Sequence, residues 1–376
     1  MARVLVYTSP ARGHLFPILG PATELAARGH DVHVLTLSDE VELVHSLGLG
    51  AEPIDARVEA REMDDYKGRD PREALSLGLA AMADRAPHDH DDLAAAITRH
   101  GPDVLVVDDN SWGAQVAAEA SGLPWCGFQP FFTPLPSRDV PPFGPGLRPD
   151  AGLVGRVRDR VLGRVIMRGF AKAVLPTVNE LRARDGLAPL RHVAAFLARP
   201  PRTIYFTAEP LEYPRSDWPG SFVMVGPATW SPPASTPAWL DDIDRRIVLV
   251  TCSTELQADR DILENALAGL ADEDVFVVGT SAAQDPSTFD VGSRARVERF
   301  LPHDAIVDRA VAVVCHGGMG ITQRALSKGV PVCVVPHGRD QHEVARRVER
   351  AGAGVRLLPR DLTPESLREA VQRTRT

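Results

Sequence analysis

Residues 313–341 read VVCHGGMGITQRALSKGVPVCVVPHGRDQ, and this stretch decides the fold class. An apolar run ends at His316, three glycines follow within four residues, a helical stretch comes next, and a second apolar run begins at Val330. Continuous apolar runs are typical of parallel strands that are buried on both faces. A helix between two such strands makes a strand–helix–strand unit. We therefore expect an α/β fold with a doubly wound parallel sheet around this stretch.

The same alternation occurs in both halves of the chain. RVLVYTS (3–9) and DVHVLTLS (31–38) are expected strands with a helix at 18–30 between them, and PARGHLFP (10–17) is an expected loop. RRIVLVTCST (245–254) opens a second series. The stretch just before it, VGPATWSPPASTPAWLDDID (225–244), is rich in Pro, Ser and Thr, which is typical of a linker.

These patterns predict two doubly wound, Rossmann-like domains that face each other across a cleft. The expected boundaries are 1–225 for the N-terminal domain, 226–244 for the linker and 245–376 for the C-terminal domain. Doubly wound sheets bind ligands outside the carboxyl ends of their strands. The cleft is therefore the expected site.

One region departs from this rhythm. Residues 133–149 are rich in proline and are expected to be a loop, whereas 153–184 are helical, with arginines between apolar residues. Such a helix can lie on a membrane surface or on nucleic acid. Its apolar residues serve equally well for packing on the first domain. We favour a wall for a bulky apolar ligand.

Composition limits the classes of function. The 376 residues carry a formal net charge of −8, which argues against a nucleic-acid partner. The four cysteines form no C-x-x-C pair and are expected to be buried free thiols in a reducing cytosol. No apolar run approaches the roughly 18 residues of a membrane span, and the start does not read as a signal peptide. We expect a cytoplasmic protein, and a homodimer stays open.

The glycines that follow the apolar run at 313–315 indicate a candidate phosphate site. A strand that passes through glycines into a helix exposes backbone N–H groups at the positive end of the helix dipole, and this favours phosphate. His316 can donate a further hydrogen bond there. Neither G-x-G-x-x-G nor the P-loop pattern occurs in this stretch. A structural turn with a satisfied histidine explains the same residues equally well.

Several ordered motifs together resemble the nucleotide-sugar-dependent glycosyltransferases of the GT-B fold, in their actinomycete antibiotic and natural-product branch. The motifs are GHLFP (13–17), PDVLVVDDNSWGA (102–114), VERFLPH (297–303) and residues 316–341. The resemblance implies that the first domain binds the acceptor and the second binds the nucleotide-sugar. Relatives that use UDP often carry a glutamate where this chain has Arg324. The absence of this glutamate favours a dTDP-sugar.

The resemblance also implies the residues that bind the donor. They contact the diphosphate, the base or the sugar hydroxyls: Thr251, Ser253, Thr254, Leu301, Pro302, His303, His316, Gly317, Gly318, Met319, Gly320, Ile321, Thr322, Asp340 and Gln341.

His14 and Asp108 form the expected catalytic pair. A histidine near neutral pH can accept the proton of an acceptor hydroxyl, and a carboxylate can hold the other ring nitrogen. Asp109 is the near alternative to Asp108. The non-catalytic alternatives are that His14 caps a helix or contacts phosphate and that Asp108 is the N-cap of a helix. The expected acceptor-binding residues are Gly13, Trp112, Phe131, Phe132, Phe143 and Met167.

The expected function is inverting transfer of a sugar from a dTDP- or UDP-sugar to an apolar natural product, with a deoxysugar as the expected sugar and O-transfer favoured over C-transfer. We expect no cofactor beyond this co-substrate and no metal, because helix-terminal N–H groups can stabilise the leaving diphosphate. PHDHDD (87–92) and DDID (241–244) offer metal-ligand types, but we expect an acidic first helical turn and a linker there. A nucleotide-sugar epimerase and a non-catalytic helper of a partner transferase are the alternatives.

Overall fold

The computed structural model describes residues 1–253 and 259–374, and the chain forms two compact units. Unit 1 comprises Met1–Phe143, Pro149–Ala208 and Pro214–Trp230. Unit 2 comprises Gly144–Arg148, Glu209–Tyr213 and Ser231–Thr376. Two short segments from the first part of the sequence thus belong to the second unit.

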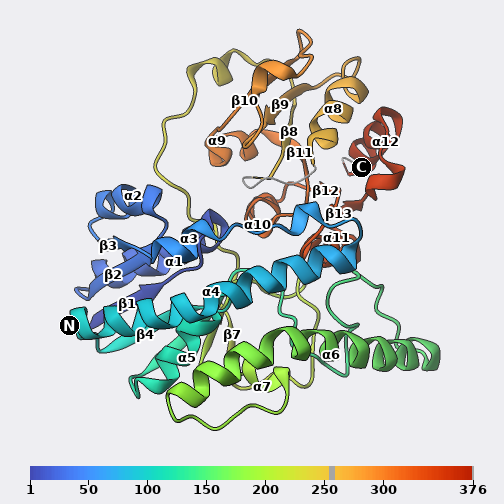
Figure 1. Ribbon diagram of the computed structural model, residues 1–376. Helices are drawn as coiled ribbons and strands as arrows, with labels where there is room; N and C mark the ends of the chain where they lie inside the picture. Colours follow the sequence, from blue (N-terminus) through green and yellow to red (C-terminus); the bar gives the residue numbers. More distant parts are fainter. Residues whose placement is uncertain (254–258, 375–376) are drawn as a thin grey trace. The chain divides into compact units, whose positions relative to one another are not determined.

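Unit 1 is built on a seven-stranded parallel sheet, whose elements can be followed in Figure 1. In spatial order the strands are β3 (Gly50–Pro53), β2 (Asp31–Thr36), β1 (Arg3–Tyr7), β4 (Val104–Asp108), β5 (Trp125–Gln129), β6 (Thr203–Tyr205) and β7 (Phe222–Met224). The order reverses between β1 and β4, and ligands bind at such a switch point.

Helices cover both faces of this sheet. They are α1 (Arg12–Ala27), α2 (Val41–Ser46), α3 (Ala56–Ala60), α4 (Pro71–His100), α5 (Trp112–Ala120), α6 (Leu153–Arg184) and α7 (Val193–Leu197). Buried side chains of α1 pack on one face of the strands, and those of α4 and α5 pack on the other. Short 3-10 turns occur at Ser38–Glu40 and Asp65–Lys67.

Unit 2 repeats the plan with six parallel strands. Their spatial order is β10 (Ala295–Glu298), β9 (Phe276–Thr280), β8 (Ile247–Thr251), β11 (Ala310–Cys315), β12 (Val332–Val334) and β13 (Gly354–Arg356). The helices are α8 (Arg260–Gly269), α9 (His303–Val307), α10 (Met319–Ser327), α11 (Gln341–Arg350) and α12 (Pro364–Thr374), and 3-10 turns lie at Ala238–Asp242, Pro286–Thr288 and Pro359–Asp361. The switch point lies between β8 and β11. The predicted pair of doubly wound parallel sheets is confirmed.

The start of α1 corrects the predicted loop at 10–17. The helix begins at Arg12, so His14 lies in its first turn, and Pro17 and Pro21 lie inside the helix. Leu15, which precedes Pro17, is buried on the sheet like Ile18. Because this packing stabilises the first turn, the helix begins before Pro17, although proline usually indicates a helix boundary.

The segment 87–92 is also corrected. It lies within the 30-residue helix α4 rather than in a first turn, and Pro87 is inside that helix. Asp89 and His90 are buried. Apolar packing on both sides of the segment, at Ala86 and Leu93, carries the helix through.

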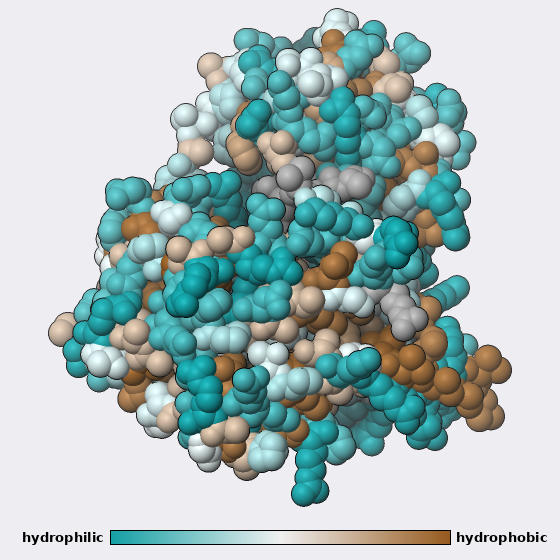
Figure 2. All heavy atoms as spheres, in the orientation of Figure 1, coloured by the Kyte–Doolittle hydropathy of each residue, from teal (hydrophilic) through white to brown (hydrophobic). Residues whose placement is uncertain are grey.

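Helix α6 divides into two halves with different surroundings. In its carboxyl-terminal half Phe170, Val174, Val178 and Leu181 are buried, as packing on the first domain predicts. In its amino-terminal half the apolar residues are more than half exposed, at Leu153, Val154, Val157, Val161 and Val165. Figure 2 shows this apolar surface over the amino-terminal part of α6. For this half, the expected wall for a bulky apolar ligand stays a prediction. Within the described ranges no helix is both long and apolar enough to cross a membrane.

Candidate functional site

The switch point of unit 1 brings His14 and Asp108 together. Asp108 ends β4, and His14 lies in the first turn of α1, which follows β1. Nδ1 of His14 lies 2.8 Å from Oδ2 and 3.1 Å from Oδ1 of Asp108. The Asp108 side chain is completely buried, whereas that of His14 is 17% exposed. The carboxylate therefore holds one ring nitrogen while the ring keeps access to solvent.

Asp108 is itself fixed by neighbours. The N–H and hydroxyl of Ser9 each donate to its Oδ2 at 3.1 Å, and the N–H of Asn110 donates to its Oδ1 at 2.8 Å. The Nδ2 of Asn110 lies 3.4 Å from Nε2 of His14. These contacts orient the carboxylate toward Nδ1, and Nε2 is the ring nitrogen that the carboxylate does not hold.

The neighbouring Asp109 is in a different environment. Burial, and then the charge of Asp108, raise the pKa of its carboxyl well above the usual value. Its Oδ1 has no hydrogen-bond partner within the described part of the chain and lies where a side chain at Gly127 would have to go. The geometry thus selects Asp108 rather than Asp109 as the histidine's partner.

The expected acceptor-binding residues fall into three groups. The Phe131 ring lies 5.6 Å from the His14 ring between centroids, and Gly13 is exposed beside it. Trp112, Phe143 and Met167 belong to one apolar cluster between α4, α5, α6 and α7, and Trp112 itself is almost completely buried. Phe132 is completely buried. Of the expected acceptor residues, Phe131 therefore has a ring contact with the histidine.

The switch point of unit 2 holds His316, the residue that follows β11. Gly317 has φ +102, a conformation that side chains rarely adopt, and Gly318 is the N-cap of α10. A Cβ at Gly318 would lie 2.7 Å from Nε2 of His316, so the glycine makes room for the imidazole. A Cβ at Gly320 would meet nothing within 4 Å. The glycines therefore allow the His316 ring to lie against the start of α10 and leave space around the first turn of that helix.

Burial governs the electrostatics of His316. It lowers the pKa of the imidazole to about 4, and the charges of His337 and Arg339 add to the effect. Nδ1 lies 3.8 Å from Oδ2 of Asp259, too far for a hydrogen bond. Burial likewise raises the pKa of Asp259 to about 6. His316 is thus a neutral imidazole at physiological pH.

Other expected donor residues surround this turn. Thr251 ends β8, and its buried hydroxyl has no hydrogen-bond partner within residues 1–253 and 259–374. Ser253 is buried, and its N–H donates to Asp259. Thr254 lies outside the described residues. Asp340 is the N-cap of α11, and Oε1 of Gln341 accepts from the N–H groups of His337 and Gly338 at 2.7 and 3.0 Å. Gln341 therefore braces the turn before α11.

The residues expected to contact the base of the nucleotide lie at the start of α9. Leu301 and Pro302 precede α9 and are partly buried, and His303 begins that helix. Nε2 of His303 lies 3.3 Å from the Thr280 hydroxyl, and burial followed by the charge of Arg324 lowers its pKa to about 4. Arg324 is buried and donates to Asp304.

The first turn of α10 contains the remaining expected residues. Met319 is buried and Ile321 is partly buried. Thr322 is completely buried, and its hydroxyl lies 3.7 Å from Sγ of Cys315. Its side chain therefore points into unit 2, and the backbone of this turn carries the donors that face outward.

Sequence reasoning missed residues that hold the site residues in place. Ser9 and Asn110 fix Asp108, and Asp259 lies between Ser253 and His316. Nε2 of His337 lies 3.0 Å from Asp261; burial would lower the pKa of His337, but the hydrogen bond and charge of Asp261, with smaller contributions from Val335 and Asp259, together raise it. Asp259 is the N-cap of α8, a position that favours aspartate, and this signal could have drawn attention to it.

The chain is similar to known proteins over most of its length. Residues 264–375 match the family model described as erythromycin biosynthesis protein CIII-like, C-terminal domain. The 4'-demethylrebeccamycin synthase of Lentzea aerocolonigenes is 34% identical over an alignment of 391 positions, which covers 99% of this chain and 91% of the relative. A PGL/p-HBAD biosynthesis glycosyltransferase of Mycobacterium tuberculosis is 32% identical over 281 residues, covering 72% of this chain and 62% of the relative.

Solved structures show the same fold. The calicheamicin glycosyltransferase CalG4 superposes with a TM-score of 0.75 at 19% identity, covering 100% of this chain and 90% of the other. The glycosyltransferase VinC, solved in complex with DTDP, superposes with a TM-score of 0.70 at 24% identity, covering 100% and 91%. The two-sheet fold is the GT-B fold of these enzymes.

Proposed function

Because the chain belongs to the GT-B glycosyltransferases of antibiotic and secondary-metabolite biosynthesis, we propose that it is an inverting enzyme that moves a sugar from a dTDP- or UDP-sugar to a hydroxyl of an apolar natural product. The single observation that carries the proposal is the 2.8 Å contact between Nδ1 of His14 and the buried Asp108 at the switch point of unit 1. A histidine held in this way presents Nε2 as a general base.

The proposed step begins with the acceptor hydroxyl. Nε2 of His14 takes its proton as the oxygen attacks the anomeric carbon, and the bond from that carbon to the diphosphate oxygen breaks. The nucleoside diphosphate leaves with the electron pair, and Asp108 stabilises the imidazolium. Attack from the face opposite the leaving group inverts the anomeric configuration, so an α-linked donor gives a β-linked product.

Unit 2 supplies the proposed site for the leaving group. Backbone N–H groups at the start of α10 and a neutral His316 can donate hydrogen bonds to the diphosphate oxygens, and the helix dipole favours their charge. The orphaned hydroxyl of Thr251 offers another donor at the same edge of the sheet. No metal or further cofactor has a part in this proposal.

We propose a dTDP-sugar ahead of a UDP-sugar. Arg324 stands where many UDP-using relatives carry a ribose-binding glutamate, and here it is paired with Asp304. The likeness to VinC, which holds DTDP, supports the same choice. The likeness to 4'-demethylrebeccamycin synthase supports a natural-product acceptor. Phe131, beside His14, offers an apolar contact for it.

A mass-shift assay tests the proposal. The full-length protein is incubated with dTDP- and UDP-sugars and a panel of apolar aglycones, in the presence and absence of EDTA. We expect one sugar mass to be added to an aglycone, faster from the dTDP donor, with turnover retained in EDTA. Interconversion of nucleotide-sugars without an acceptor would instead indicate an epimerase. No turnover without a partner transferase, with turnover by that partner, would indicate a helper.

A further inference from the structure

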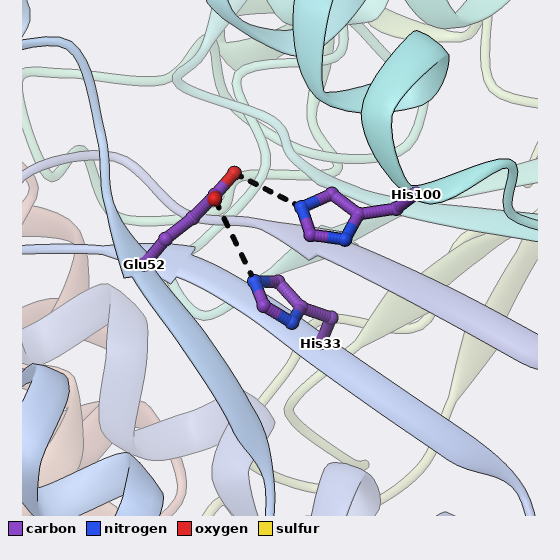
Figure 3. A group of neighbouring side chains, drawn as sticks. All are labelled: His33, Glu52 and His100. Atoms are coloured by element: carbon purple, nitrogen blue, oxygen red, sulfur yellow. Dashed lines mark hydrogen bonds and ion pairs between the residues drawn. The ribbon is translucent and has the colours of Figure 1, made fainter.

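A group of metal-ligand side chains lies in unit 1, away from the residues assigned to sugar transfer. His33 lies on β2, Glu52 lies on the neighbouring strand β3, and His100 is the last residue of α4. Figure 3 shows the two imidazoles facing the two oxygens of one carboxylate. We propose that His33, Glu52 and His100 bind a divalent transition-metal ion of the zinc type.

The distances suit such an ion. Nε2 of His100 lies 3.2 Å from Oε1 of Glu52, and Nε2 of His33 lies 3.9 Å from Oε2. The three ligand atoms all lie within 4.8 Å of one another. In a tetrahedron with bonds of about 2.0–2.2 Å, neighbouring ligand atoms are roughly 3.4 Å apart. Small rotations of the side chains therefore close the set around one ion.

The protein holds His33 in a ligating position. Its Nδ1 lies against Gly50, where a Cβ would come within 2.4 Å, so the glycine allows the ring to lie flat on the neighbouring strand. Its Nε2 is buried and has no hydrogen-bond partner in the described ranges, because Glu52 is too distant for one. An unsatisfied buried nitrogen that faces a carboxylate and a second imidazole is unusual without a ligand.

The protonation states also suit a metal. Burial and the neighbouring His100 lower the pKa of His33, which keeps the imidazole neutral. Burial raises the pKa of Glu52, but hydrogen bonds from Arg99 and His100 outweigh it and hold this pKa below the usual value. Neutral imidazole and ionised carboxylate are the forms that bind zinc. The guanidinium of Arg99 also donates to Glu52, and it competes with the ion for that carboxylate.

Two side chains on strands and one at a helix end make a site that joins three elements. The side chains are 25–28% exposed, so an ion can enter from solvent and keep a water as its fourth ligand. His100 precedes β4, whereas Asp108 ends that strand. The site therefore lies toward the opposite end of the strand from the catalytic pair, and it acts on the stability of unit 1 rather than on the transfer step.

The test uses full-length, tag-free protein that has been stripped of metal with a chelator. We expect calorimetry to show one equivalent of Zn²⁺ bound and Co²⁺ to give the visible spectrum of a four-coordinate ion. His33→Gln and His100→Gln should each weaken binding by more than about tenfold and abolish the rise in melting temperature that Zn²⁺ gives. His45→Gln, a matched control at a nearby histidine outside the group, should bind as the wild type does.

Gly50→Ala gives a second test, because it keeps all three ligands. Its Cβ should displace the His33 ring and weaken Zn²⁺ binding several-fold, and far-UV circular dichroism in chelator should confirm that the variant is folded. Zn²⁺ affinity in His100→Gln or Gly50→Ala equal to that of the wild type would overturn the proposal. An equal loss in His45→Gln, or no stoichiometric binding by the wild type, would do so too.

Discussion

His14 and His316 each lie beside the switch point of a sheet, yet their surroundings differ. Each follows a strand at the switch point of its sheet. His14 has a buried carboxylate at 2.8 Å and is partly exposed, whereas His316 is 3.8 Å from Asp259 and its pKa is lowered to about 4. The histidines at the two switch points therefore suit two chemistries. A paired, accessible imidazole suits proton transfer, and a buried neutral one suits a hydrogen bond to an anion.

The largest expected effect concerns His14. His14→Ala removes the proposed base, and we expect kcat for sugar transfer to fall by about 10²–10⁴-fold while nucleotide affinity changes little. Steady-state kinetics and calorimetric titration with dTDP would check both quantities. Unchanged turnover would exclude His14 as the base and remove the contrast with His316.

The next effect concerns the partner carboxylate. Asp108→Asn keeps the shape but no longer holds the imidazole tautomer or stabilises the imidazolium, and we expect kcat to fall on the order of 10²–10³-fold. Asp109→Asn is the matched control. The carboxyl contacts of His14 that the structure shows are to Asp108, and burial raises the pKa of Asp109, so this change should have little effect on transfer. Equal losses in the two variants would contradict the selection of Asp108.

The third effect is the acid sensitivity that His316 confers. Its pKa is about 4 in the folded protein, below its ordinary value of about 6.5 in the unfolded chain. Between these values the unfolded chain takes up a proton that the folded protein does not, so stability falls as pH falls from about 6.5 to about 4. The cost reaches about 3 kcal/mol at the acid end.

Denaturant unfolding across this pH range would measure that cost. His316→Gln should show a shallower loss of stability with acid, and the contribution of His303 cancels in the comparison because both proteins keep it. Parallel pH profiles for the two proteins would mean that His316 is not buried in the way described.

The smallest expected effect concerns donor affinity. His316→Gln should weaken binding of dTDP about tenfold, because one hydrogen bond to a charged group is lost or lengthened. The affinity of the wild type should be independent of the charge of His316 between pH 6 and 8. Calorimetric titration at several pH values would check both points, and a variant that binds dTDP as the wild type does would separate His316 from the phosphate site.

Much of the fold could be predicted because its signals are local. The strands expected at 3–9, 31–38 and 245–254 contain β1, β2 and β8, and the apolar run that opens residues 313–341 belongs to β11. Where packing competed with local signals, prediction was wrong. α1 begins before Pro17, and α4 continues through Pro87.

The sequence by itself determined the parallel sheets, their glycine-broken strand ends and the candidate histidines, because periodicity and residue type act over a few neighbouring positions. Only the tertiary structure decided which carboxylate holds His14, how far His316 is removed from water, and that His33, Glu52 and His100 meet. These features depend on distances between residues that are far apart in the chain. Such distances are fixed by how strands pair and helices pack, and no single stretch of sequence contains them.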